Sequence, residues 1–169
     1  NDPANWSPAV PNQPGAIALF GPLTGPLLDV VLEDGPATVG EIQFFGPGVV
    51  TITGSETLTL AAGELCGLPR ILVDAEAPTP LLDLTIGGNQ GLEKVGGGAV
   101  DLHGTLVYTG PTEISQGALL LGPSTLLPNE PIIVQEEALL DVSLHPIYAL
   151  GAQQLLAAAE KDIAAGNFE

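Results

Sequence analysis

Residues 97–122 read GGAVDLHGTLVYTGPTEISQGALLLG, and this stretch decides the fold. It contains short runs in which apolar and polar residues alternate, such as Val100-Asp101-Leu102. A period of two is typical of a β-strand with one buried face. Gly110-Pro111 and Gly122-Pro123 predict corners between strands, because glycine permits positive φ angles and proline removes a backbone donor. The stretch therefore predicts short strands that follow one another through tight corners.

Similar runs recur along the chain and favour a coil of repeating turns. Their markers are Leu58, Leu84, Val100, Leu119 and Leu139, which lie 26, 16, 19 and 20 residues apart. Turns of the larger β-solenoids take roughly 20 to 29 residues, so the steps favour a short, slightly irregular parallel β-helix. The alternative is an antiparallel β-sandwich or jelly roll, whose strands repeat about every 8 to 12 residues.

The alternation also assigns side chains to the inside or the outside of the coil. Leu82, Leu84 and Ile86 are expected inside, with Asp83 and Thr85 outside. The same rule places Ile42, Phe44, Val100 and Leu102 inside and Phe45, Asp101, His103 and Leu120 outside. Aromatic residues make up 4% of the chain, which suits a narrow core of stacked aliphatic side chains better than a broad sandwich core.

Four short motifs lie in and just before the central stretch. They are Lys94-Val95-Gly96, Gly98 to Leu102, Tyr108-Thr109-Gly110 and Gly117 to Leu121. Together they resemble the passenger-associated β-strand repeat of bacterial autotransporters and related surface proteins, with Pro111 in place of a second turn glycine. This resemblance implies a parallel β-helix on a bacterial exterior, and it implies no catalytic residue.

The charge of the chain excludes some classes of partner. Lys and Arg total 3 against 20 Asp and Glu, which gives a formal net charge of −17. Nucleic-acid binding needs basic residues at phosphates, and an anionic membrane surface also attracts basic segments, so neither partner is expected. No apolar run is long enough to insert into a membrane. Calcium is the one cofactor considered, because divalent cations would screen this charge when subunits pack together.

The chain is expected to have two parts. Residues 1–148 are predicted to form the β-solenoid with a Pro-rich N-terminal arm, and residues 149–169 a C-terminal α-helix that packs on the solenoid or on a neighbour. Cys66 is the single cysteine, so no internal disulfide is expected, and we interpret it as a small apolar filler. The absence of methionine favours a secreted chain from which a signal peptide has been removed.

Carboxylates and histidines give no strong catalytic constellation. Asp83 and Asp101 are expected to stack on one outward face, which we interpret as a solvated acidic surface rather than a glycosidase site. Asp101 and His103 share a face and predict a histidine–carboxylate contact, but no Gly-x-Ser-x-Gly elbow accompanies them. His145 is interpreted as a packing residue, and the two histidines and one cysteine have no zinc spacing.

Basic residues that a polysaccharide lyase would need are equally scarce. Arg70, Lys94 and Lys161 are the whole supply, and Arg70 is expected to neutralise Asp74 or Glu76. The sequence therefore predicts a protein that is not an enzyme.

The main functional hypothesis is a structural subunit of a self-assembling fibre, sheath or surface layer. The ends of a β-solenoid are unpaired strand edges that must be capped or paired with another subunit. The expected contact residues are Trp6, Phe45, Leu120, Leu155, Ile163 and Phe168.

Two alternatives stay open at this point. The first is a β-helix that binds or cleaves carbohydrate such as cell-surface glycans, with Trp6, Tyr108 and Tyr148 as its exposed rings. The second is an adhesin stalk fragment that has been cut from a longer chain.

Overall fold

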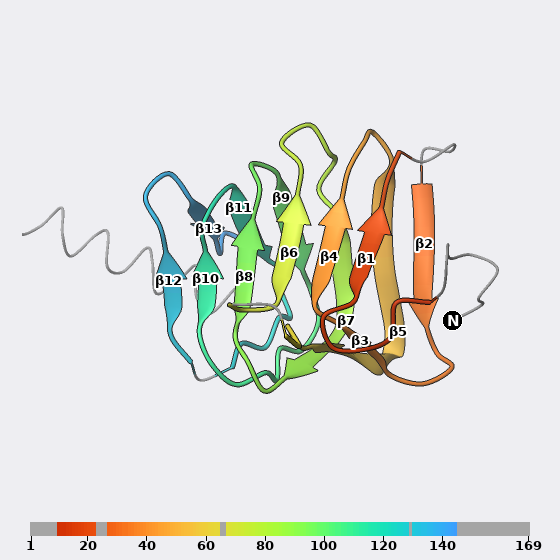
Figure 1. The fold of residues 1–169 in the computed structure, drawn as a ribbon. Coiled ribbons are helices and arrows are strands. Elements are labelled where there is room, and N and C mark those ends of the chain that lie inside the picture. The colour runs from red at the N-terminus through yellow and green to blue at the C-terminus, as the bar shows by residue number, and fades with distance from the viewer. Residues whose placement is uncertain (1–9, 23–26, 65–66, 129, 145–169) are drawn as a thin grey trace, which may run out of the picture.

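The protein is a parallel β-solenoid of about five turns (Figure 1). The computed structural model describes residues 10–22, 27–64, 67–128 and 130–144. Every strand pair among these residues is parallel, which confirms the β-helix and excludes the sandwich and the jelly roll. The expected C-terminal helix, most of the N-terminal arm and Cys66 lie outside the described residues.

One wall of the coil is a six-stranded sheet, called sheet A here. In the order in which they pair, its strands are β1 (Ile17–Phe20), β4 (Glu41–Phe44), β6 (Arg70–Val73), β8 (Leu92–Val95), β10 (Thr112–Ile114) and β12 (Ile132–Val134). These strands lie side by side across the front of Figure 1. Buried and more exposed residues alternate along these strands, as in β4, where Ile42 and Phe44 are buried and Glu41 and Gln43 are not, so one side of the sheet faces the core.

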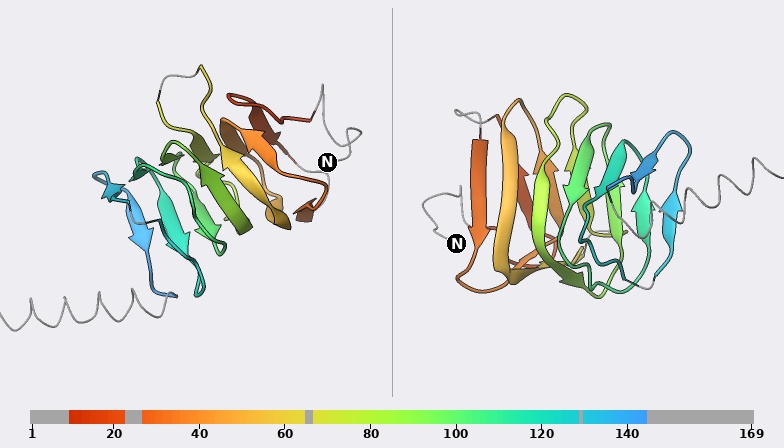
Figure 2. Two further views of the ribbon diagram at one scale, coloured as in Figure 1. Left: turned by 90° about the horizontal axis from the view of Figure 1, so that it is seen from below. Right: turned by 180° about the vertical axis from the view of Figure 1, so that it is seen from behind.

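A second wall, sheet B, lies behind sheet A and is seen from the back in Figure 2. Its strands are β2 (Leu27–Leu32), β5 (Val49–Leu60), β7 (Leu81–Gly88), β9 (Ala99–Leu102), β11 (Ala118–Leu121) and β13 (Leu139–Asp141), and β3 (Ala37–Val39) pairs with the far end of β5. The pairing of β5 with β7 shifts register between Thr53 and Thr57. The second halves of β5 and β7, with β3, therefore form a third face of the coil.

The pairing register defines the length of each turn. In sheet A one column of aligned residues runs through Ile17, Glu41, Arg70, Glu93, Glu113 and Ile133, so successive turns take 24, 29, 23, 20 and 20 residues.

Two of the sequence-based markers are wrongly aligned. Leu58 pairs with Ile86 on the third face rather than with Leu84, and Leu119 pairs with Leu140 rather than with Leu139. The predicted steps are irregular because some markers do not pair with one another and because the turns themselves differ in length, as the column in sheet A shows.

The core is a column of aliphatic side chains, as expected. Leu82, Leu84, Ile86, Val100 and Leu102 are all buried. Ile42 and Phe44 are also buried, and the ring of Phe44 stacks on that of Phe20 in the turn below, with 5.3 Å between ring centroids. The inward positions predicted from alternation are therefore confirmed.

Glycines sit where two turns approach too closely for a side chain. A Cβ on Gly104 would lie 1.7 Å from the carbonyl oxygen of Leu84 in the preceding turn. Gly96 has φ +78°, which favours glycine, and it turns the chain from β8 toward β9.

Candidate functional site

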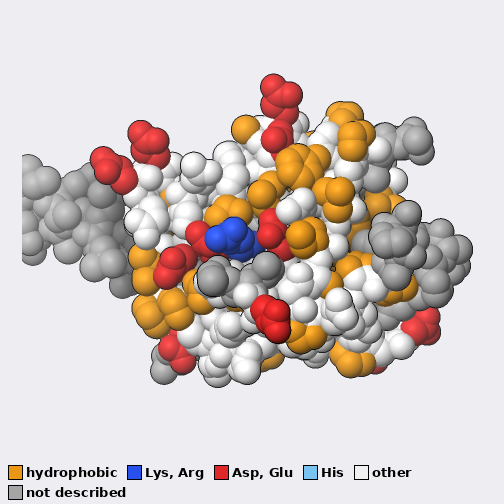
Figure 3. Space-filling model, in the orientation of Figure 1, with side chains coloured by type: hydrophobic (Ala, Val, Ile, Leu, Met, Phe, Trp, Pro, Cys, Tyr) orange, Lys and Arg blue, Asp and Glu red, His pale blue; other side chains and the backbone are white. Residues whose placement is uncertain are grey.

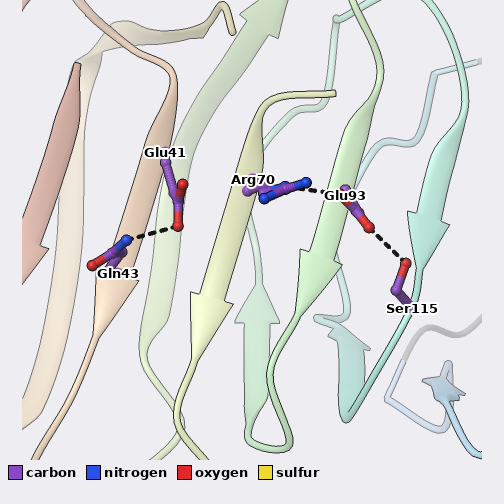
Figure 4. A network of polar contacts seen from close by, with 5 residues as sticks. All are labelled: Glu41, Gln43, Arg70, Glu93 and Ser115. Carbon is purple, nitrogen blue, oxygen red and sulfur yellow. Dashed lines mark hydrogen bonds and ion pairs between the residues drawn. The ribbon is translucent and has the colours of Figure 1, made fainter. Parts of the chain in front are cut away.

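The outer face of sheet A carries a polar network in its centre (Figure 4). The Nε of Arg70 donates to Oε2 of Glu93 at 3.0 Å, and the Oγ of Ser115 donates to Oε1 of the same carboxylate at 2.8 Å. On the neighbouring turn, Nε2 of Gln43 donates to Oε1 of Glu41 at 2.8 Å. Parallel pairing places Glu41, Arg70 and Glu93 next to one another in one column.

Arg70 does not pair as the sequence analysis expected. Its partner is Glu93, one turn away, rather than Asp74 or Glu76, and Asp74 instead accepts the backbone N–H of Glu76 at 3.0 Å. Figure 3 shows a blue basic patch near the centre of this face, between acidic side chains. The Arg70 side chain is 46% exposed, so water screens this ion pair and it contributes about 1 kcal/mol or less to stability.

Asp101 and His103 lie together on the outer face of sheet B. The Oδ1 of Asp101 is 3.1 Å from Nε2 of His103, which confirms the predicted contact. The imidazole lies over Gly122 of the next turn, where a Cβ would be 2.2 Å from Cδ2 of the ring. The pair is thus held against the backbone of a neighbouring turn.

The expected stack of Asp83 on Asp101 does not form. Asp101 pairs in register with Leu81, and Leu82 with Leu102, so that Asp83 lies beside Asp101 diagonally rather than directly above it. The two carboxylates therefore belong to different columns of the same outer face, which does not give the convergent pair that glycoside hydrolysis requires.

Among the described residues, Lys94 is the charged side chain that the core encloses. It occupies an inward position of β8, pairs with Ile71 and Ile114 in the adjacent turns, and is fully buried. Its Nζ donates to the carbonyl oxygens of Val95 at 2.9 Å, Gly96 at 2.9 Å and Gln116 at 3.2 Å. Because these carbonyls belong to two successive corners, the ammonium group ties one turn to the next.

Burial also changes the chemistry of Lys94. Loss of water around the ammonium group lowers the pKa of Lys94 from 10.5 to about 8. The burial of Lys94 was not predicted from the sequence, where it was interpreted only as a lead-in residue of the repeat and as one of the few basic residues. Its position two residues after the buried Leu92 on an alternating strand is the signal that predicts an inward side chain.

Tyr108 is not the exposed ring that the carbohydrate hypothesis needed. It is 1% exposed, and its hydroxyl lies 2.5 Å from Oγ1 of the buried Thr112. Burial raises the pKa of the Tyr108 phenol. Of the other two rings considered, Trp6 and Tyr148 both lie outside the described residues.

The predicted contact residues are only partly described. Phe45 and Leu120 are half-buried, and Leu120 points outward between the buried Leu119 and Leu121. Trp6, Leu155, Ile163 and Phe168 lie outside the described residues. The structure does not bring Phe45 and Leu120 into one patch, because Phe45 directly follows β4 of sheet A and Leu120 lies in β11 of sheet B.

Exposed large apolar side chains gather at the two ends of the coil, which sequence reasoning missed. The first turns carry Ile17, Leu19, Leu27, Val31 and Val49, and the last turns carry Leu126, Ile133, Val134, Leu139 and Leu144. Between these groups, the described residues include only Val107 of this kind. The two ends are therefore the candidate functional surface.

The two ends differ in shape. At the N-terminal end an apolar hollow of about 450 Å³ opens between sheets A and B, and it is lined by residues that include Ala18, Phe20, Leu28 and Val30. At the C-terminal end the inward residues are less covered than those one turn earlier: Val134 is 44% exposed, whereas Ile114 is 0% exposed.

Within the described residues, no group of three or more His, Cys, Asp or Glu side chains could hold a metal ion. In that same part of the chain no helix is long and apolar enough to cross a bilayer.

Comparisons with known proteins identify no relative of this chain, so a function must be inferred from the fold and from the two ends of the coil. No protein-family model matches the chain. No curated protein and no solved structure matches it either.

Proposed function

We infer that the chain is a non-enzymatic structural protein whose subunits associate through the ends of the solenoid into a fibre, sheath or surface layer. The observation that carries this proposal is the concentration of exposed apolar side chains at both ends. Contiguous exposed apolar surface is typical of interaction sites in proteins that are otherwise soluble.

Unpaired strand edges support the same proposal. Among the described residues, β1 and β2 are paired on one side only, and so are β12 and β13 at the other end. Such edges present free backbone donors and acceptors, which other chains can pair with. On the third face, one backbone donor at the N-terminal end already has a partner. The N–H of Thr38 in β3 donates to Oδ1 of Asn12 at 2.8 Å.

An extracellular site of action is part of the proposal. The resemblance of residues 94–122 to the autotransporter passenger repeat supports a secreted protein on a bacterial surface. The net charge of −17 supports a role for calcium or another divalent cation in screening repulsion between subunits. Cell-surface glycans are a further partner under the same proposal, although the burial of Tyr108 removes one of the rings that supported them.

Sedimentation velocity across a wide concentration range, with and without calcium, tests the proposal. We expect assemblies to grow with concentration, and negative-stain electron microscopy of the same samples should show elongated particles. A chain that stays monomeric at the highest concentration in both buffers would refute self-assembly. A chelator that leaves assembly and melting temperature unchanged would remove calcium from the proposal.

A further inference from the structure

The outer column of sheet A changes character at its two ends. It reads Ile17, Glu41, Arg70, Glu93, Glu113 and Ile133 from the first turn to the last. The four middle positions are charged, whereas Ile17 is 50% exposed and Ile133 is 40% exposed. If a second copy continued the coil, Ile133 of one copy would lie next to Ile17 of the other and both would leave water.

Sheet B shows the same pattern in another column. Leu27 pairs with Val49 at the first turn, and Ala99, Ala118 and Leu139 pair in succession at the last turns. Leu27 and Leu139 are each 56% exposed, whereas the two alanines between them are half-buried. Large apolar side chains thus occupy both terminal positions of a column whose later interior positions hold alanine.

The core columns match in the same way. Ala18 and Leu28 line the N-terminal hollow, and they occupy the same columns as Val134 and Leu140 at the C-terminal end. A C-terminal end placed on an N-terminal end would continue the stacking of inward side chains without a change of register. It would also bury the apolar hollow.

We propose that the occupant of each end is a second copy of this chain, with β12 pairing in parallel with β1 and β13 with β2 of the next copy. This inference rests on the proposed function and adds its geometry: head to tail, with Ile133 beside Ile17 and Leu139 beside Leu27. The two contact surfaces are different from each other, so the contact is heterologous and repeats without closing unless a rotation closes a ring. The assembly is therefore a filament in which each sheet runs on from copy to copy.

The same register places two carboxylates against each other. Asp141 follows Leu140 in β13 and Asp29 follows Leu28 in β2, so the two occupy facing positions at the joint. Neighbouring parallel strands lie about 4.8 Å apart, so these like charges repel at close range. The repulsion makes assembly sensitive to salt and cations at one defined position.

Charge reversal at this position tests the register. The variants are Asp29→Lys, Asp141→Lys and the double variant, in the full chain at low salt. Asp83→Lys is the matched control, because it makes the same charge change on the exposed face of sheet B away from both ends. Circular dichroism confirms that each variant is folded, and sedimentation velocity gives the concentration at which assembly begins.

Each single end variant should begin to assemble at a concentration roughly tenfold lower than the control. The reason is that attraction replaces repulsion between two side chains on strands about 5 Å apart. The double variant should lose this gain, because two lysines then face each other. If Asp29→Lys, Asp141→Lys and Asp83→Lys assemble alike, the register is wrong but self-assembly stands. If no variant and no wild-type sample assembles, the register and the proposed function both fail.

Discussion

Replacing Lys94 with methionine gives a direct test of how the core holds a charge. The substitution keeps an unbranched side chain between Ile71 and Ile114 but removes the ammonium group. In the folded wild type the pKa of Lys94 is about 8, against 10.5 for an ordinary lysine. Between these two pH values the unfolded chain binds more protons than the folded chain, so the free energy of unfolding must rise with pH.

The size of this rise follows from the two pKa values. Below pH 8 both states carry the proton, and the cost of the buried charge is largest, about 3 kcal/mol. From pH 7 to 9.5 the difference in proton binding adds about 2 kcal/mol of stability to the wild type. Burial raises the pKa of Tyr108, which has the opposite effect on stability, but that effect develops mainly above this range and is present in both proteins.

Urea denaturation followed by circular dichroism at pH 7, 8 and 9.5 measures the difference between the two proteins. The wild type should gain about 2 kcal/mol relative to Lys94→Met across this range. Parallel curves of stability against pH for the two proteins would refute the reasoning, because Lys94 would then titrate alike in the folded and unfolded chain. Lys94→Arg serves as a control that keeps a charge which does not titrate in this window.

Two other contacts between turns give predictions of their own. Gly104→Ala should destabilise the fold by more than about 3 kcal/mol, because its Cβ would meet the backbone oxygen of Leu84; thermal unfolding against Gly21→Ala, which has open space, checks this. Tyr108→Phe should cost about 1–3 kcal/mol in urea denaturation, because it leaves the buried hydroxyl of Thr112 without its partner. Adding Thr112→Val should recover part of that loss, and a purely additive double variant would contradict the hydrogen bond.

The spacing of the recurring runs favoured a parallel coil over a sandwich, and alternation within each run predicted which side chains lie inside. Leu82, Leu84 and Ile86 are separated by polar residues, and each is buried as the period of two requires. The three-sided cross-section was not predictable in this way, because the register shift between Thr53 and Thr57 leaves no periodic signal. Whether a side chain points inward or outward can be predicted from the alternation in its own strand. Which residue it pairs with in the next turn depends on the lengths of the corners between the two strands.

The candidate site was harder to predict for a related reason. Which residues lie at an end of the coil depends on how many turns the chain completes, and only the pairing shows that Ile17 and Ile133 share a column. The burial of Lys94 and Tyr108 is different, since both lie two residues after a buried leucine. Their burial was not predicted because lysine and tyrosine are less often fully buried than aliphatic residues. This expectation outweighed the alternation of buried and exposed positions, which favoured an inward side chain.

The parallel ladders between turns bear on how the molecule would respond to tension. Backbone hydrogen bonds cross from strand to strand, so in this coil they run along the long axis and a pull on the two ends loads them directly. The pairing of β7 with β9 is the shortest between described strands, with only Leu81–Asp101 and Leu82–Leu102 in register. The same two turns are also joined by β6 with β8 and by the bridge between Ile86 and Leu106, so tension at this short pairing is shared with the other faces of the coil.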